Sequence, residues 1–206
     1  MRPVGGFSGR ILAVVLAVLV LGACGSDSPA LSTADPLHYL ITIDQLVAPD
    51  FTVSSAAAHV TAATIANGDD SLAQALASAG LQSAASVEYQ RGVDFGTSNG
   101  PIDVVATVER FGSVSGASSA YEVTVRYLDA IQGAVPTSTG PLGDQAHAIS
   151  VVKNTASGIL AVEVTIVWRV GNLVNLMVGR GRYGGTRLDD ALVLAGLQTQ
   201  NETSPG

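Results

Sequence analysis

The strongest constraint on the fold is a pair of β-rich segments in the last quarter of the chain. Segments 160–170 and 173–178 are separated only by the two residues Gly171-Asn172. A two-residue link that contains glycine is a strong signal for a β-hairpin, because glycine adopts the positive φ that the tight turn requires. The chain is therefore expected to contain an antiparallel sheet.

A second hairpin is predicted earlier in the chain, between segments 86–95 and 102–111. Apolar and polar residues alternate from Ile102 onward, a pattern typical of a strand with one buried face and one face in water. Asp103, Thr107 and Glu109 are assigned to the wet face by this alternation. Shorter strands are expected at 37–43 and 146–152.

Four helices are expected from capping residues and apolar spacing. Ranges 55–66 and 71–79 come first, with Asp69 or Asp70 as the cap of the second helix. Helix 117–132 follows Gly116, with an apolar stripe at Ala117, Tyr121, Val125 and Leu128. Thr186 is expected to cap a last helix that ends near Gln198.

These elements predict a single α+β domain over residues 37–200, followed by a short disordered tail, 201–206. Because the strands come mainly in hairpins and the helices are few, we expect a curved, mainly antiparallel sheet with helices packed on one face. A domain of this size can bury a core without disulfides. The only cysteine, Cys24, precedes the domain.

The first 23 residues have the composition of a secretory signal. Arg2 and Arg10 precede an uninterrupted apolar run of eleven residues, 11–21. At ~1.5 Å rise per residue this run is about 16 Å long as a helix, whereas a bilayer core is ~30 Å thick. The segment is therefore too short for a permanent span.

Residues Leu21-Gly22-Ala23-Cys24 resemble the lipobox of bacterial lipoproteins. The resemblance implies cleavage before Cys24 and diacylation of its thiol, with acyl chains such as palmitate as the membrane anchor. The small, polar, proline-containing stretch 24–36 then serves as a flexible tether. These features predict an extracytoplasmic, lipid-anchored protein; an ordinary secreted protein with an unrelated cysteine is the alternative.

The charge of the chain argues against nucleic acid as a partner. The formal net charge is −7, and removal of Arg2 and Arg10 with the signal changes it to −9. Residues 24–90 contain seven acids and no Lys or Arg. Binding of nucleic acid or anionic lipid requires a basic face, so the acyl chains must supply the membrane attachment.

The second half of the chain resembles small lipoproteins of actinobacteria and the extracellular sensor domains of their serine/threonine kinases. The resemblance rests on segment 140–146 (GPLGDQA) before a strand and on Arg169-Val170-Gly171-Asn172 between the last two strands. Gln145 stands where the family has an acid, and the cysteines of the kinase domains are absent from this chain. The resemblance implies a fold and an extracytoplasmic location, and no catalytic residues.

Few residues suggest chemistry. Gly96-Thr97-Ser98-Asn99-Gly100 matches the hydrolase pattern G-x-S-x-G, but Pro101 and a strand follow it where that motif needs a helix. His38, His59 and His147 lack the spacing of a helical metal pair, and the pairs Asp69-Asp70 and Asp189-Asp190 are expected to cap helices. We expect no catalytic residue, metal or cofactor.

The best candidate for a binding site is the segment 180–187 (RGRYGGTR), which joins the last strand to a helix. Arg180, Arg182, Arg187 and Thr186 could hold an anion beside the amides of the helix start. Alternatively, the arginines pair with Glu163, Asp189 or Asp190. Trp168, the only tryptophan, is expected in the core.

Three functions are compatible with this sequence. The leading hypothesis is a non-enzymatic lipoprotein that binds a small or apolar ligand or an envelope component. A sensor or protein-interaction module without a cavity is the second hypothesis. An esterase-like hydrolase at Ser98 is the third.

Overall fold

The computed structural model describes residues 31–46 and 48–203 of the chain. Its strands are β1 (Phe51–His59), β2 (Leu81–Arg91), β3 (Asp103–Phe111), β4 (Ala134–Thr137), β5 (Gln145–Asn154), β6 (Leu160–Val170) and β7 (Leu173–Arg182). Its helices are η1 (Pro36–Tyr39), η2 (Ile43–Gln45), α1 (Ala62–Ile65), α2 (Asp70–Ser78), α3 (Val114–Asp129) and α4 (Leu188–Thr203), of which η1 and η2 are 3₁₀ turns.

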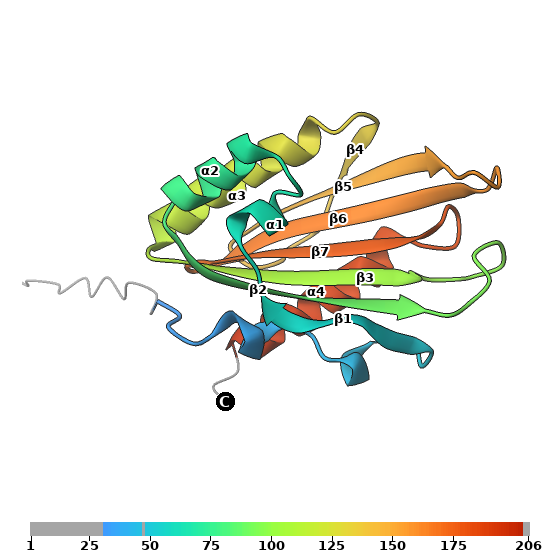
Figure 1. Cartoon of the computed structure of the whole chain (residues 1–206), viewed down its shortest axis with the longest axis horizontal. Helices are drawn as coiled ribbons and strands as arrows, with labels where there is room; N and C mark the ends of the chain where they lie inside the picture. The colour runs from blue at the N-terminus through green and yellow to red at the C-terminus, as the bar shows by residue number, and fades with distance from the viewer. Residues whose placement is uncertain (1–30, 47, 204–206) are drawn as a thin grey trace, which may run out of the picture.

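The strands form one open, seven-stranded antiparallel sheet with the order β1-β2-β3-β7-β6-β5-β4 (Figure 1). Two meanders, β1 to β3 and β4 to β7, meet where β3 pairs with β7. Both predicted hairpins are confirmed, and Gly171 has the positive φ of 57° that its turn requires. The α+β class is therefore confirmed.

Helices cover both faces of the sheet, not one face as the sequence analysis expected. Buried residues of α2 and α3 form one apolar cluster with Phe111, Val151 and Val167 of the sheet. Ala191 and Leu194 of α4 belong to a second cluster on the opposite face. Figure 1 shows α1 to α3 in front of the sheet and α4 behind it.

The second cluster contains the largest side chain of the core. Trp168 of β6 is fully buried there, as predicted, and the same cluster contains Met177 of β7. The turn of chain between η1 and η2 adds Leu40 and Ile41 to the same cluster, and the Tyr89 hydroxyl donates a hydrogen bond to the Ile41 carbonyl at 2.9 Å. The N-terminal segment is thus an integral part of the α4 face.

The wet face predicted for β3 is wrong at its far end. Glu109 is fully buried and Thr107 is 8% exposed. The alternation itself is real, because Val104, Ala106 and Val108 face the α4 side. The helices α1 to α3 cover part of the other face, so polar residues of β3 are buried beneath them.

Two local predictions for the N-terminal third are also wrong. Residues 37–43 form no strand, because Asp35 and Pro36 start the 3₁₀ turn η1, with Asp35 Oδ1 accepting a hydrogen bond from Leu37 N at 2.9 Å. Residues 55–59, expected to be helical, belong to the edge strand β1, which pairs with β2. Every residue of β1 after Phe51 is exposed, so this strand has no apolar alternation from which it could be predicted. Its pairing with β2 makes it a strand.

The cap of α2 agrees with the sequence analysis, whereas the cap of α4 does not. Asp69 Oδ1 accepts hydrogen bonds from Ser71 N and Leu72 N at 2.9 Å, so the predicted carboxylate cap of α2 is confirmed. At α4 the predicted cap, Thr186, instead donates to the Gly100 carbonyl at 2.8 Å. Asp190 Oδ2 accepts from Arg187 N at 2.8 Å and takes the capping role.

The ends of the described chain are held more firmly than the sequence suggested. Ser32, within the expected tether 24–36, donates its backbone N–H to Asn172 Oδ1 at 2.7 Å. Residues 201–203 of the expected tail belong to α4, and Asn201 Nδ2 donates to the Leu40 carbonyl at 3.3 Å. The expected signal 1–23, Cys24 and residues 204–206 lie outside the described residues.

No helix in the described part of the chain is long and apolar enough to cross a bilayer.

Candidate functional site

A pocket of about 380 Å³ lies at the end of the sheet where β2 and β3 are joined. Its volume falls within the ~300–1,000 Å³ of small-molecule sites. Segments far apart in the sequence supply its wall: the residues before β1, the β2–β3 loop and the first turns of α4. The lining residues are Leu46, Ala48, Phe51, Arg91, Asn99, Gly100, Pro101, Asp190, Val193 and Leu194.

The β2–β3 loop is tied to the segment between β7 and α4 by short backbone contacts. Gly100 N donates to the Gly185 carbonyl at 2.8 Å, and Thr186 Oγ1 donates to the Gly100 carbonyl at 2.8 Å. A Cβ atom at Gly185 would lie 2.5 Å from the Ser98 carbonyl oxygen, so glycine is required for this close approach. These contacts fix Gly100 in the pocket wall.

Arg91 is the cation of the pocket wall. Its side chain is only 12% exposed, and its Nη1 donates to the Asn99 carbonyl at 2.9 Å. The contact from Nη2 to Asp50 Oδ2 is long, at 3.4 Å. The guanidinium carbon lies 5.7 Å from the centre of the Phe51 ring, a cation–π distance that orients the group.

Asp190 is the anion of the pocket wall. It lies in the first turn of α4, and its cap contact with Arg187 N holds the carboxylate beside the helix start. The positive end of the helix dipole stabilises a carboxylate at this place. The remaining lining residues are apolar or uncharged, so the wall combines one positive and one negative group on an apolar surface.

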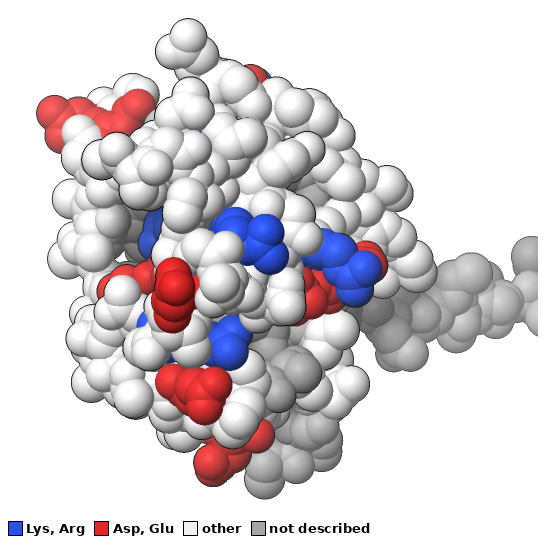
Figure 2. Space-filling model, turned by 90° about the vertical axis from the view of Figure 1, so that its right-hand side faces the viewer, with Lys and Arg blue, Asp and Glu red and all other residues white. Residues whose placement is uncertain are grey.

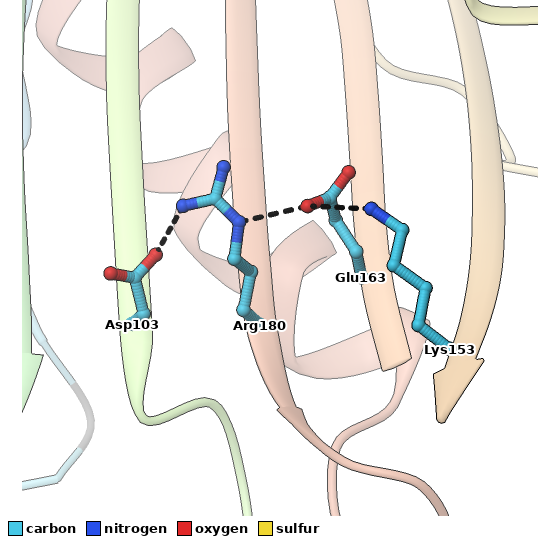
Figure 3. A network of polar contacts seen from close by, with 4 residues as sticks. All are labelled: Asp103, Lys153, Glu163 and Arg180. Atoms are coloured by element: carbon cyan, nitrogen blue, oxygen red, sulfur yellow. Dashed lines mark hydrogen bonds and ion pairs between the residues drawn. The ribbon is translucent and has the colours of Figure 1, made fainter. Parts of the chain in front are cut away.

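The four residues predicted as an anion site do not share one contact network. Arg180 lies in a row of charges on the part of the sheet that α1 to α3 leave uncovered (Figure 3). Its Nη1 is 2.8 Å from Asp103 Oδ1, and its Nε is 2.8 Å from Glu163 Oε2. Lys153 Nζ extends the row at 3.8 Å from Glu163 Oε2. The pairing of Arg180 with Glu163 is the alternative that the sequence analysis had named.

The same row contains a pair of acids. Glu88 of β2 shares a hydrogen bond with Asp103. This bond, together with burial and the negative charge of Asp103, raises the pKa of Glu88. Arg180 opposes that rise. Burial lowers the pKa of Arg180, but Glu163 and Asp103 together raise it above its ordinary value. The acidic and basic side chains of the row therefore neutralise most of one another's charge.

The other three predicted residues lie beside the pocket rather than in its wall. Arg182 Nε donates to the Ser98 carbonyl at 3.2 Å, and Nη2 donates to Asn99 Oδ1 at 3.3 Å. Thr186 is buried against the β2–β3 loop, to which its hydroxyl is hydrogen-bonded, whereas Arg187 is exposed. Figure 2 views this end of the molecule and shows acidic and basic side chains interspersed, without a large patch of one sign.

Ser98 lies in a loop between strands, which is the context that the sequence analysis preferred to a hydrolase elbow. Its side chain is 7% exposed, and its hydroxyl donates to the Phe95 carbonyl at 3.1 Å. Two histidines have other partners: His59 Nε2 is 3.2 Å from Asp35 Oδ2, and His147 Nε2 is 2.8 Å from Asp129 Oδ1. Ser98 has no hydrogen bond to a histidine within residues 31–46 and 48–203.

No cluster suited to a metal ion is found in the described residues: no three His, Cys, Asp or Glu side chains gather there. Two buried carboxyl groups stand apart from one another. Burial raises the pKa of Glu109 to about 8. Burial also raises the pKa of Glu202 to about 8, and the neighbouring Asn175 side chain opposes part of this rise.

Sequence reasoning missed the pocket and both of its charged residues. Asp190 was assigned to capping, which it does perform, and Arg91 was assigned no role. The long acidic stretch, 24–90, is the one sequence signal that could have drawn attention to Arg91. Nothing local in the sequence connects Arg91 with Asp190.

The comparisons with known proteins concern the fold. The chain is similar to the crystal structure of the extracellular domain of PknH from Mycobacterium tuberculosis, with a TM-score of 0.50 and 11% sequence identity. The match covers 81% of this chain and 94% of that chain. No family model matches the chain, and no curated protein is similar enough in sequence to count as a relative.

Proposed function

We propose that this chain is an extracytoplasmic lipoprotein, anchored by acyl chains on Cys24, whose domain binds a small ligand with an apolar body and catalyses no reaction. The lipobox-like residues Leu21-Gly22-Ala23-Cys24 support the anchor. The similarity in fold to an extracellular domain supports the location. The Ser98 hydroxyl donates to the Phe95 carbonyl rather than to a general base, which supports a binding role rather than catalysis.

The pocket is the observation that carries the ligand-binding proposal. A module that only docks other proteins needs no cavity, whereas this domain has one of about 380 Å³ with an apolar wall. Phe51 and Leu194 are buried members of the α4-face core and also line the pocket, so the core itself supports the wall. Burial of an apolar ligand there gains ~25 cal/mol per Å² of apolar surface.

The anchor and the pocket would lie at opposite ends of the domain. Ser32 is held at the β6–β7 turn by Asn172, whereas the pocket adjoins the β2–β3 loop at the other end of the sheet (Figure 1). Cys24 precedes Ser32 by eight residues, and an extended chain spans at most ~3.6 Å per residue. A domain held this way presents its pocket on the side away from the attachment.

Binding of a neutral apolar probe tests the proposal. We would titrate 4-phenylbutan-1-ol into the full acylated protein in phospholipid nanodiscs, with empty nanodiscs as the reference, by calorimetry. Saturable binding is expected, and Val193→Trp should weaken it at least about tenfold, because the half-exposed Val193 lines the pocket.

Val135→Trp is the matched control, since Val135 is also an exposed valine but lies on the edge strand β4 outside the pocket. The control should bind like the unmodified protein. Equal binding by all three proteins would contradict the proposal.

A further inference from the structure

We infer that the pocket selects a small zwitterion with an apolar body, of the class of a free apolar amino acid or a short apolar peptide with both ends unblocked. The inference rests on the proposed function and names the chemical class of its ligand. Three features of the wall carry it: its balance of charge, the unused hydrogen-bonding capacity of Arg91, and the position of the Asp190 carboxylate.

The balance of charge decides between ligand classes. Arg91 and Asp190 are the only charged residues of the described lining. A fatty acid would place its carboxylate in a pocket that contains the Asp190 carboxylate, and an apolar amine would meet Arg91 in the same way. A zwitterion offers each wall group an opposite charge, and complementary charges of this kind give specificity.

Arg91 retains capacity to bind a carboxylate. Its contact with Asp50 Oδ2, at 3.4 Å, is longer than the ~2.7–2.9 Å of a charge-assisted hydrogen bond. Its Nε–H is buried and has no partner among the described residues. The planar guanidinium, held beside the Phe51 ring, matches the geometry of a carboxylate.

Asp50 does not cancel this capacity. It lies outside the pocket lining, and 57% of its side chain is exposed, so water and salt screen its charge. Its long contact with Arg91 can give way to a ligand carboxylate at little cost, because an exposed ion pair contributes only ~0–1 kcal/mol.

Asp190 is placed to receive an ammonium group. Its Oδ2 accepts from Arg187 N at 2.8 Å, while Oδ1 has no hydrogen bond in the described part of the chain. The helix start orients this carboxylate without using both of its oxygens. An ammonium group carries three donors and can share the free oxygen.

The test uses compounds with one apolar body and different charges. Calorimetry on the acylated protein in nanodiscs would compare phenylalanine with N-acetylphenylalanine, phenylalaninamide and N-acetylphenylalaninamide. Phenylalanine is expected to bind at least about tenfold more tightly than either singly charged compound. Phenylalanyl-phenylalanine is the second zwitterion, and tighter binding of either zwitterion supports the class and identifies its source as free amino acid or peptide.

Two variants test which residue of the wall binds the carboxylate of the ligand and which binds its ammonium group. Arg91→Gln should remove the preference for phenylalanine over phenylalaninamide, and Asp190→Asn should remove the preference over N-acetylphenylalanine. Asparagine keeps the acceptor that caps Arg187 N, so the start of α4 is retained. Retained binding of N-acetylphenylalaninamide shows that the pocket of each variant is folded.

Matched controls are the exposed neighbours Arg187→Gln and Asp189→Asn, which change charge outside the lining and should keep the order of affinities. If the neutral or a singly charged compound binds as tightly as both zwitterions, the ligand class is overturned while the pocket remains a binding site. If 4-phenylbutan-1-ol and every compound of this series fail to bind, the proposed function itself is overturned.

Discussion

Gln198 of α4 donates a hydrogen bond from Nε2 to Asn175 Oδ1 of β7 at 3.1 Å, and both side chains are fully buried. The same Nε2 lies 3.3 Å from the Thr107 carbonyl of β3. One amide thus joins α4 to two neighbouring strands within the core. A polar contact of this kind fixes the register of the helix on the sheet, because any shift leaves buried polar groups unpaired.

Replacing Gln198 tests the role of this contact. Gln198→Leu keeps the volume but leaves the buried Asn175 Oδ1 without its donor, and is expected to lower the free energy of unfolding by about 1–3 kcal/mol. Urea unfolding followed by the fluorescence of Trp168, the only tryptophan, measures the change. Gln200→Leu, at an exposed position of α4, should stay within about 0.5 kcal/mol of the unmodified protein. Equal stabilities of the two variants would contradict this account.

The buried carboxyls predict a stability that falls as pH rises. Both Glu109 and Glu202 have a pKa of about 8 when folded, against an ordinary 4.5, so in this window the folded chain keeps protons that the unfolded chain has lost. The free energy of unfolding should therefore decrease with rising pH between these values, by up to about 1.4 kcal/mol per pH unit for each carboxyl. Well below pH 4.5 both carboxyls are protonated in the folded and the unfolded chain, so neither makes the free energy of unfolding depend on pH.

Single substitutions measure how much each carboxyl contributes to this fall of the free energy of unfolding with pH. Glu109→Gln and Glu202→Gln should each make the fall of stability between pH 5 and 8 shallower by up to ~1.4 kcal/mol per unit, measured by urea unfolding at fixed pH values. Glu122→Gln, on the exposed side of α3, is the control and should keep the original slope. A slope that neither buried substitution changes would show that these carboxyls ionise normally in the folded chain.

The close approach at Gly185 predicts opposite effects for two alanine substitutions. Gly185→Ala forces a Cβ atom to within 2.5 Å of the Ser98 carbonyl oxygen and is expected to destabilise the protein by about 1–3 kcal/mol and to weaken ligand binding. Gly196→Ala meets no atom within 4 Å in the middle of α4 and should stabilise by about 0.5–1 kcal/mol. Thermal unfolding compares them, and destabilisation by Gly196→Ala would refute the helical placement of that residue.

The charge row of Figure 3 predicts a modest, salt-sensitive contribution from Arg180. Arg180→Gln removes the cation between Asp103 and Glu163 and should cost about 1 kcal/mol at low salt, with a smaller loss at high salt. Lys153→Gln should cost less than about 0.5 kcal/mol, because its contact is long and the side chain is 59% exposed. Equal losses at low and high salt would argue against an ionic cause.

The anchor predicts covalent labelling at one residue. Cells grown with labelled palmitate should yield labelled protein in the membrane fraction, and Cys24→Ala should abolish both the label and the membrane association. Ser26→Ala, two residues later, is the control and should be labelled normally. Unlabelled unmodified protein, or protein free in the cytosol, would refute the anchor.

Local sequence determined the elements whose signals lie within a few residues. The turn at Gly171-Asn172, the Asp69 cap of α2 and the apolar stripe of α3 were all predicted, because a turn or cap depends on the φ angle and hydrogen bonds of its own residues. The strand β1 could not be predicted in this way. Its exposed small residues are compatible with a helix, and only pairing with β2 makes them a strand.

The tertiary structure alone decided which faces are covered and where the pocket lies. Glu109 follows the alternation of a wet face, yet the layer of α1 to α3 buries it. Arg91 and Asp190 are 99 positions apart in the chain (190 − 91), and both line the same pocket. Burial and the meeting of distant segments depend on how layers pack against one another, a property of the whole fold that no local pattern contains.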